Sequence, residues 1–197
     1  MSKRCENEES LKLDGSGNLA AYWFNEGLES RTIVINDEIT SNVVEQVILP
    51  LKKFEAEDVD AQVKIYLSTI GGSAWDGMVV ANIIDSVKCP VEVVVLGYAM
   101  SMGSYILMAG YNNPKVTKKC YPFSFALIHA GSLSLAGDVK KIKQTQHFND
   151  RFDKRVKEFV LTHTKITEEE YEKHEDDEWY IDSDEMLEYG LVDEIIQ

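Results

Sequence analysis

The chain has no long hydrophobic run and little cysteine. No apolar stretch approaches the roughly 20 residues that a membrane-spanning helix needs, and the polar N-terminal residues 1–9 lack the apolar core of a signal peptide. The three cysteines, Cys5, Cys89 and Cys120, are scattered and show no Cys-x-x-Cys spacing. This pattern argues against a disulfide framework and against a zinc site. We therefore predict a cytoplasmic protein with reduced thiols.

Positive charge is also scarce. The sequence has 20 Lys and Arg residues against 34 Asp and Glu residues, which gives a net charge of −14. Nucleic acids and anionic membranes would be repelled by such a chain, so both are disfavoured as partners. Much of the excess lies in residues 168–188, where twelve acids accompany the single base Lys173. A run of this kind is usually a solvated surface.

The length and the apolar pattern predict one α/β domain. A chain of 197 residues with 44% hydrophobic content can bury a sizeable core. Residues 1–18 are polar and contain Gly and Ser, which predicts a mobile tail before a single domain at 19–197. We expect strands at 32–36, 62–68, 91–97 and 123–128, and helices at 39–57 (kinked or broken at Pro50), 74–88 and 102–109. Alternation of this kind predicts a largely parallel sheet covered by helices.

A longer helix is predicted over residues 138–162. Its apolar residues recur at mostly three- or four-residue spacing: Val139, Ile142, Phe148, Phe152, Val156, Phe159 and Val160. Such a stripe needs a partner surface, and the pattern alone favours packing on its own domain as much as pairing with another subunit. His147, His163 and His174 lie in polar or turn-rich stretches. We predict that these three histidines are surface residues, and we assign them no role.

Ser101 is the most informative single residue. It lies in the segment 97–103, where an apolar strand is expected to turn into an apolar helix. A hydroxyl at a helix N-terminus is close to free N–H groups and to the positive end of the helix dipole, which can receive a developing oxyanion. Ser101 is therefore a candidate nucleophile, although a simple helix N-cap is the plainer explanation. The Gly-x-Ser-x-Gly elbow of α/β-hydrolases is excluded because Ala99 stands where it needs glycine.

Two other segments support a catalytic role for Ser101. Gly71 and Gly72 follow the expected strand at 62–68, and paired glycines allow a backbone to approach a ligand closely and to offer the Gly72 N–H to an oxyanion. His129 ends the expected strand at 123–128, which is where a general base could reach a serine at a neighbouring strand end. Taken alone, the glycines would indicate only a tight turn and the histidine a structural role.

Taken in order along the chain, these segments resemble the ClpP family, the proteolytic subunits of the ATP-dependent Clp protease. The resemblance covers most of the sequence and rests on residues 28–34, 52–58, 71–73, 77–78, 99–103, 127–129 and 188–193. It implies a ClpP/crotonase-like β-α spiral with a projecting handle helix. It also implies a serine endopeptidase that works in stacked heptameric rings, where an AAA+ unfoldase uses ATP to feed in polypeptides. The resemblance calls for no metal and no bound cofactor.

The resemblance also implies a Ser–His–acid triad and an oxyanion hole. Ser101 and His129 fall on the nucleophile and base positions of the family. An ungapped count back from Glu188-Tyr189-Gly190 puts Glu178 where the family usually has Asp. The backbone N–H groups of Gly72 and Met102 would then bind the oxyanion.

Several residues depart from the family pattern. Ile70 replaces the Pro before the double glycine, Ala130-Gly131 replaces the Gln-Pro after the histidine, and Asp177 replaces an Arg that often bridges the stacked rings; the chain is also slightly longer at 111–114. Two alternatives stay open, the first because of these departures and the second because the crotonase superfamily shares the β-α spiral and the Gly-Gly turn. One is a catalytically weak ring subunit that co-assembles with an active paralogue. The other is a crotonase-type acyl-CoA enzyme, which is disfavoured because this acidic chain has no evident patch for the CoA phosphates.

Overall fold

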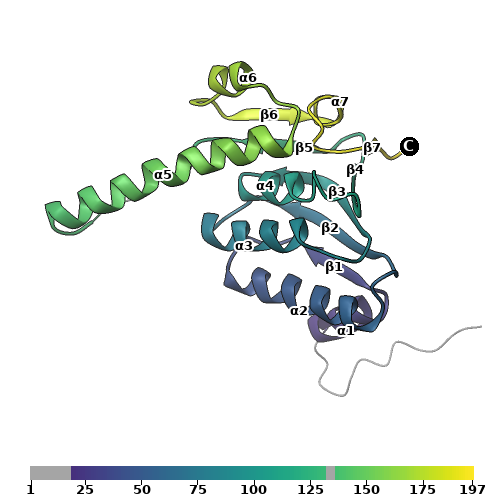
Figure 1. Ribbon diagram of the computed structural model, residues 1–197. Helices are drawn as coiled ribbons and strands as arrows, with labels where there is room; N and C mark the ends of the chain where they lie inside the picture. Colours follow the sequence, from purple (N-terminus) through teal and green to yellow (C-terminus); the bar gives the residue numbers. More distant parts are fainter. Residues whose placement is uncertain (1–18, 132–135) are drawn as a thin grey trace, which may run out of the picture.

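A computed structural model describes residues 19–131 and 136–197, so the predicted N-terminal tail at 1–18 lies outside the described residues. The helices are α1 (Leu19–Glu29), α2 (Ser41–Glu57), α3 (Ala74–Asp85), α4 (Met102–Met108), α5 (Val139–His163), α6 (Glu168–Lys173) and α7 (Ser183–Glu188). The strands are β1 (Thr32–Ile35), β2 (Val63–Thr69), β3 (Val91–Met100), β4 (Val116–Cys120), β5 (Phe125–Ile128), β6 (Trp179–Asp182) and β7 (Glu194–Ile195). Figure 1 shows this α/β arrangement with α5 extending away from the body, which confirms the predicted fold class.

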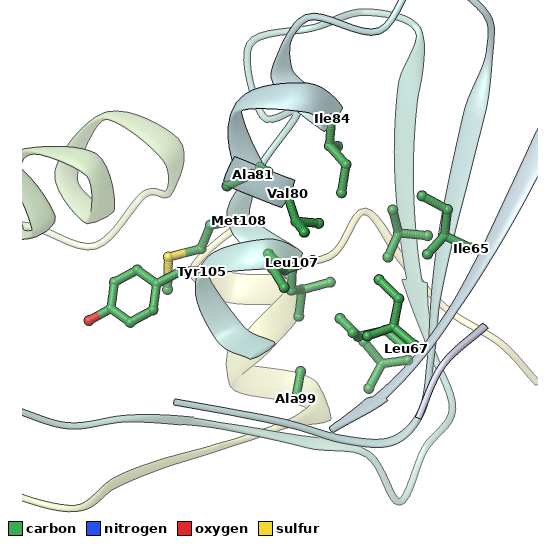
Figure 2. Close-up of a cluster of buried hydrophobic side chains, with 14 of the residues drawn as sticks. Ile65, Leu67, Val80, Ala81, Ile84, Ala99, Tyr105, Leu107 and Met108 are labelled. Carbon is green, nitrogen blue, oxygen red and sulfur yellow. The ribbon is translucent and has the colours of Figure 1, made fainter. Parts of the chain in front are cut away.

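The strands form one mostly parallel sheet. Its main path runs β1-β2-β3-β4-β7, and β5 pairs with both β3 and β6. Every pair is parallel except β5 with β6, which is antiparallel. Inward residues of β2 alternate with more exposed ones along the strand, as expected when helices cover one face. The core lies between this face and the helices: Ile65 and Leu67 of β2 meet Val80 and Ile84 of α3 and Leu107 of α4 (Figure 2).

Two predicted boundaries were wrong in ways that matter for the site. The helix expected from residue 39 begins at Ser41, because Ile39 instead forms a parallel bridge with Gly72. That helix continues through Pro50 without a break. The strand expected at 91–97 continues to Met100, because its last residues gain a second partner in β5. The end of β3 is thereby fixed from two sides.

Strand β4 was not predicted, and its buried lysine explains why. Lys118 is only 1% exposed, which interrupts the alternation that marks a half-buried strand. Its backbone N–H donates to the Asp193 carboxylate at 2.7 Å, and its Nζ donates to the Gly190 carbonyl at 3.3 Å. Burial penalises the charged amine and lowers the pKa of Lys118 to about 8. Helix α1 was not predicted either.

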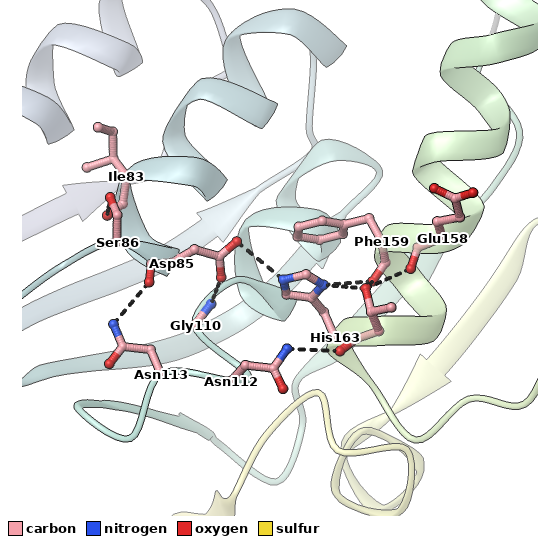
Figure 3. Close-up of polar contacts among 10 residues, drawn as sticks. Ile83, Asp85, Ser86, Gly110, Asn112, Asn113, Glu158, Phe159 and His163 are labelled. Carbon is pink, nitrogen blue, oxygen red and sulfur yellow. Dashed lines mark hydrogen bonds and ion pairs between the residues drawn. The ribbon is translucent and has the colours of Figure 1, made fainter.

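The last turn of α5 is anchored on the body of the molecule. Val160 is fully buried, and Asn112 Nδ2 donates to the Thr162 carbonyl at 3.1 Å. His163 Nε2 lies 3.3 Å from the Asp85 carboxylate, and its ring stacks on Phe159 with centroids 3.9 Å apart (Figure 3). None of the described helices is both long and apolar enough to cross a membrane. The anchored turn holds α5 where it leaves the body.

The prediction that His163 and His174 are surface residues was wrong. The His163 side chain is 16% exposed because it is sandwiched between Phe159 and Asp85. The His174 side chain is 22% exposed because it stacks on Trp179, with centroids 4.5 Å apart. His147 is exposed on α5, as predicted.

Candidate active site

The backbone at Ser101 is held in a conformation that non-glycine residues rarely adopt. Ser101 joins β3 to α4 with φ of 50° and ψ of −123°. A left-handed φ of this kind costs about 1–3 kcal/mol and persists only where the surroundings enforce it. Here the Ser101 N–H donates to the Leu127 carbonyl at 2.9 Å, and the Ser104 N–H and hydroxyl donate to the Ser101 carbonyl at 2.9 and 2.7 Å. Such enforced residues cluster at functional sites.

The Ser101 side chain does not cap α4. Its hydroxyl makes no capping hydrogen bond, so the plainer explanation of this serine is wrong. The Oγ atom instead lies 2.9 Å from Nε2 of His129. The positive φ turns the side chain away from the helix and toward the neighbouring strand end.

The register of the sheet brings His129 and Glu178 next to Ser101. In the parallel pair of β3 and β5, Met100 lies opposite Leu127. In the antiparallel pair of β5 and β6, Ile128 lies opposite Trp179. His129 follows Ile128 and Glu178 precedes Trp179, so the two residues come next to each other at the end of this strand pair. His129 Nδ1 is 3.0 Å from Glu178 Oε1. With Nδ1–H donating to this carboxylate, Nε2 is free to accept the proton of Ser101.

The neighbouring acid Asp177 faces a different histidine. Its carboxylate is 3.3 Å from His174 Nδ1, whereas Glu178 contacts His129. The two acidic side chains are almost equally exposed, at 63% and 61%. Asp177 closes the turn after α6, where its N–H donates to the His174 carbonyl at 3.0 Å, whereas Glu178 leads directly into β6, which explains the division. The geometry therefore supports Glu178 as the partner of His129.

The double glycine lies against Ser101 so closely that no side chain would fit. A Cβ atom on Gly71, where φ is +95°, would lie 2.7 Å from the Ser101 Cβ and 2.9 Å from the Met102 nitrogen. Met102 is the first residue of α4, so its N–H has no partner within the helix. Gly71 thus brings the turn before α3 up to the start of α4.

The bridge between Ile39 and Gly72 leaves one donor unused. Ile39 donates to the Gly71 carbonyl and Ser73 donates to the Ile39 carbonyl, both at 2.8 Å. These bonds use the neighbours of Gly72 and not its own N–H. Within residues 19–131 and 136–197, neither the Gly72 N–H nor the Met102 N–H donates to another group. Two free backbone donors beside a serine hydroxyl are suited to binding an oxyanion.

Two residues that support this turn were missed in the sequence. Thr69 is 1% exposed; its hydroxyl donates to the Asp37 carbonyl at 2.6 Å and accepts from the Gly71 N–H at 3.1 Å. Ser104, fully buried, holds the Ser101 carbonyl. Thr69 could have been found from the sequence, because it is a polar residue at an inward-facing position of β2. In the described parts of the chain, no three His, Cys, Asp or Glu side chains are grouped to hold a metal ion.

Comparison with known proteins gives one consistent family. The family model described as Clp protease matches residues 16–197. A protein of Deinococcus radiodurans described as "ATP-dependent Clp protease proteolytic subunit" is 24% identical over 186 residues, which cover 94% of this chain and 90% of the relative. The match spans the turn at Gly71, the strand end at Ser101 and the pair of His129 and Glu178. The chain therefore belongs to the Clp protease family.

Proposed function

We propose that this chain is a serine endopeptidase of the Clp type. The proposal is supported above all by the hydrogen-bonded series from Ser101 through His129 to Glu178. Ser101 Oγ attacks the peptide carbonyl while His129 Nε2 takes its proton and passes it to the leaving amine. Water then releases the acyl group with His129 as the base. Glu178 orients the imidazole, and the N–H groups of Gly72 and Met102 bind the oxyanion.

The family suggests the substrate and the partner. We propose that unfolded polypeptides are cleaved inside a chamber of two stacked heptameric rings, into which a separate AAA+ unfoldase feeds them. We propose that the assembly works in the cytoplasm, where ATP is available to that partner. The proposed reaction needs no metal and no bound cofactor, since the attacking group, the base and the oxyanion donors all belong to the chain.

A first prediction concerns assembly through α5. Val139 is 69% exposed and Phe148 is 42% exposed, and Val160 is the helix's one buried residue. Apolar side chains left open to water on the outer part of this helix favour contact with another copy. Mass photometry should therefore show a species far heavier than the 22.3 kDa chain. Val139→Asp should shift it to lower mass, whereas Val59→Asp, in the turn after α2, should not. A stable monomer at micromolar concentration would contradict the chambered mechanism.

The second prediction tests the peptidase itself by covalent labelling. A fluorophosphonate reacts with a serine only where a base activates the hydroxyl and donors stabilise the oxyanion. We expect modification at Ser101, located by mass spectrometry, and none in Ser101→Ala or in the heat-denatured protein. The 61% exposure of Glu178 favours the weak-subunit alternative, because a solvated carboxylate holds the imidazole less firmly. Absence of labelling would support that alternative and exclude the peptidase.

A further inference from the structure

Both ends of α3 are tied to α5. At its N-terminal end, the Trp75 ring lies 4.7 Å from the Phe152 ring and 5.4 Å from the Phe148 ring, measured between centroids. We call these three residues the aromatic clamp. At its C-terminal end, Asp85 forms the ion pair with His163 that Figure 3 shows. Helix α3 therefore takes its position in part from α5.

The first turn of α3 follows the double glycine without a flexible linker. Ser73 caps the helix, because its Oγ accepts from the Asp76 N–H at 3.3 Å. The Ser73 N–H is bonded to Ile39, so the residue between Gly72 and the helix is held on two sides. Trp75 and Gly72 are therefore separated only by Ala74 and the capping residue Ser73, both of them in or directly before the first turn of α3.

The same turn also packs against the second oxyanion donor. A Cβ atom on Gly77 would lie only 2.5 Å from the Met102 Cε and 3.2 Å from its Cβ. Gly77 thus allows α3 to lie directly on the residue that opens α4. The first turn of α3 touches the segments that carry both free N–H groups.

We propose that Trp75 is a positioning residue for the oxyanion hole. Its contact with Phe148 and Phe152 holds the first turn of α3, and with it the Gly72 N–H, at the place where the oxyanion forms. Trp75 does not touch the reacting atoms. This inference rests on the proposed peptidase function, and it makes the reaction rate depend on where α5 lies.

Partial exposure makes Trp75 testable without unfolding the protein. The residue is 54% exposed and Phe148 is 42% exposed, so truncation of the indole opens no cavity in the core. An oxyanion exists only in the transition state and the intermediate. Loss of its donor therefore lowers kcat and leaves KM nearly unchanged.

The kinetic test compares Trp75→Ala with Trp75→Phe on a short fluorogenic peptide. We expect Trp75→Ala to lower kcat by about 10- to 100-fold with KM within about twofold, less than the loss when an oxyanion donor is deleted. Trp75→Phe keeps an aromatic ring in the clamp and should restore most of the rate. Phe123→Ala, which removes a ring that is 99% exposed, serves as the control and should match the wild type. An unchanged kcat in Trp75→Ala overturns the proposal.

A second measurement on the same intact proteins does not depend on activity. Amide hydrogen exchange over residues 70–78 should be faster in Trp75→Ala than in the wild type and in Phe123→Ala. If the wild type hydrolyses nothing and is not labelled at Ser101, the peptidase function fails while the exchange data still decide whether Trp75 holds the turn. Unchanged exchange over 70–78 overturns the positioning role in either case.

Discussion

Alanine at Ser101 or at His129 is expected to remove nearly all peptide hydrolysis, and the double variant should be little worse than either single one. The two side chains act as one unit, since His129 Nε2 lies 2.9 Å from Ser101 Oγ and must take its proton. Removal of one member leaves the other without a role, so the losses do not add. The oxyanion donors belong to the backbone and remain, which leaves a residual rate of about 10³-fold over water.

The measurement is kcat/KM for a short fluorogenic peptide with the three purified variants. Ser41→Ala, at an exposed serine that begins α2, is the control and should keep the wild-type rate. Substantial turnover by Ser101→Ala would exclude the serine-peptidase mechanism. Losses that multiply in the double variant would show that the two residues act independently, which contradicts a shared proton transfer.

The second large effect is expected at Glu178. Glu178→Gln should lower kcat by up to about 10⁴-fold, because an amide in place of a triad carboxylate favours the wrong imidazole tautomer. Asp177→Asn should leave the rate within about a few-fold, since an exposed charge contributes little. The two acids are adjacent and similarly exposed, and they differ in the histidine that each contacts. Each variant is therefore a matched control for the other.

The outcome of this pair distinguishes three arrangements. If the two variants exchange their effects, the acid at the site is Asp177 and the register of β6 against β5 is displaced by one residue. If neither variant matters, the site works as a Ser–His dyad or hardly at all. Native hydrolysis should be slow even with Glu178 in place, because a glutamate has one more rotatable bond than an aspartate.

The sequence predicts the parts of the fold that follow simple periodicity. The β-branched run after Pro90 indicates β3, and the apolar spacing from Val139 predicts α5 to within one residue at each end. Strand β4 is not predicted, because its inward residue Lys118 is polar. Its burial depends on contacts with Gly190 and Asp193, which are distant in the chain. Tertiary packing there overrides the local pattern.

The candidate site is predictable in its members but not in its geometry. Ser101 and His129 are predicted because each follows an expected strand. Glu178 is predicted by the count back from Glu188 that the resemblance to the family implies. The positive φ of Ser101 and the pairing of β5 with both neighbours depend on hydrogen bonds between segments far apart. The clamp between Trp75 and Phe152 is of the same kind, because nothing in the spacing of either helix indicates which aromatic ring of the other will meet it.

Helix α5 can be treated as a rigid rod that contacts the body at its C-terminal end and again at the aromatic clamp. His163 holds its end, and the clamp supports it at Phe148, about 22 Å further out at 1.5 Å per residue. About 14 Å of helix extends beyond the clamp to Val139. With His163 as the fulcrum, a shift of 1 Å at Phe148 moves the far tip by about 1.6 Å. A change of packing at Trp75 would therefore displace the tip of α5, where the proposed contact between copies lies, by more than it displaces Phe148.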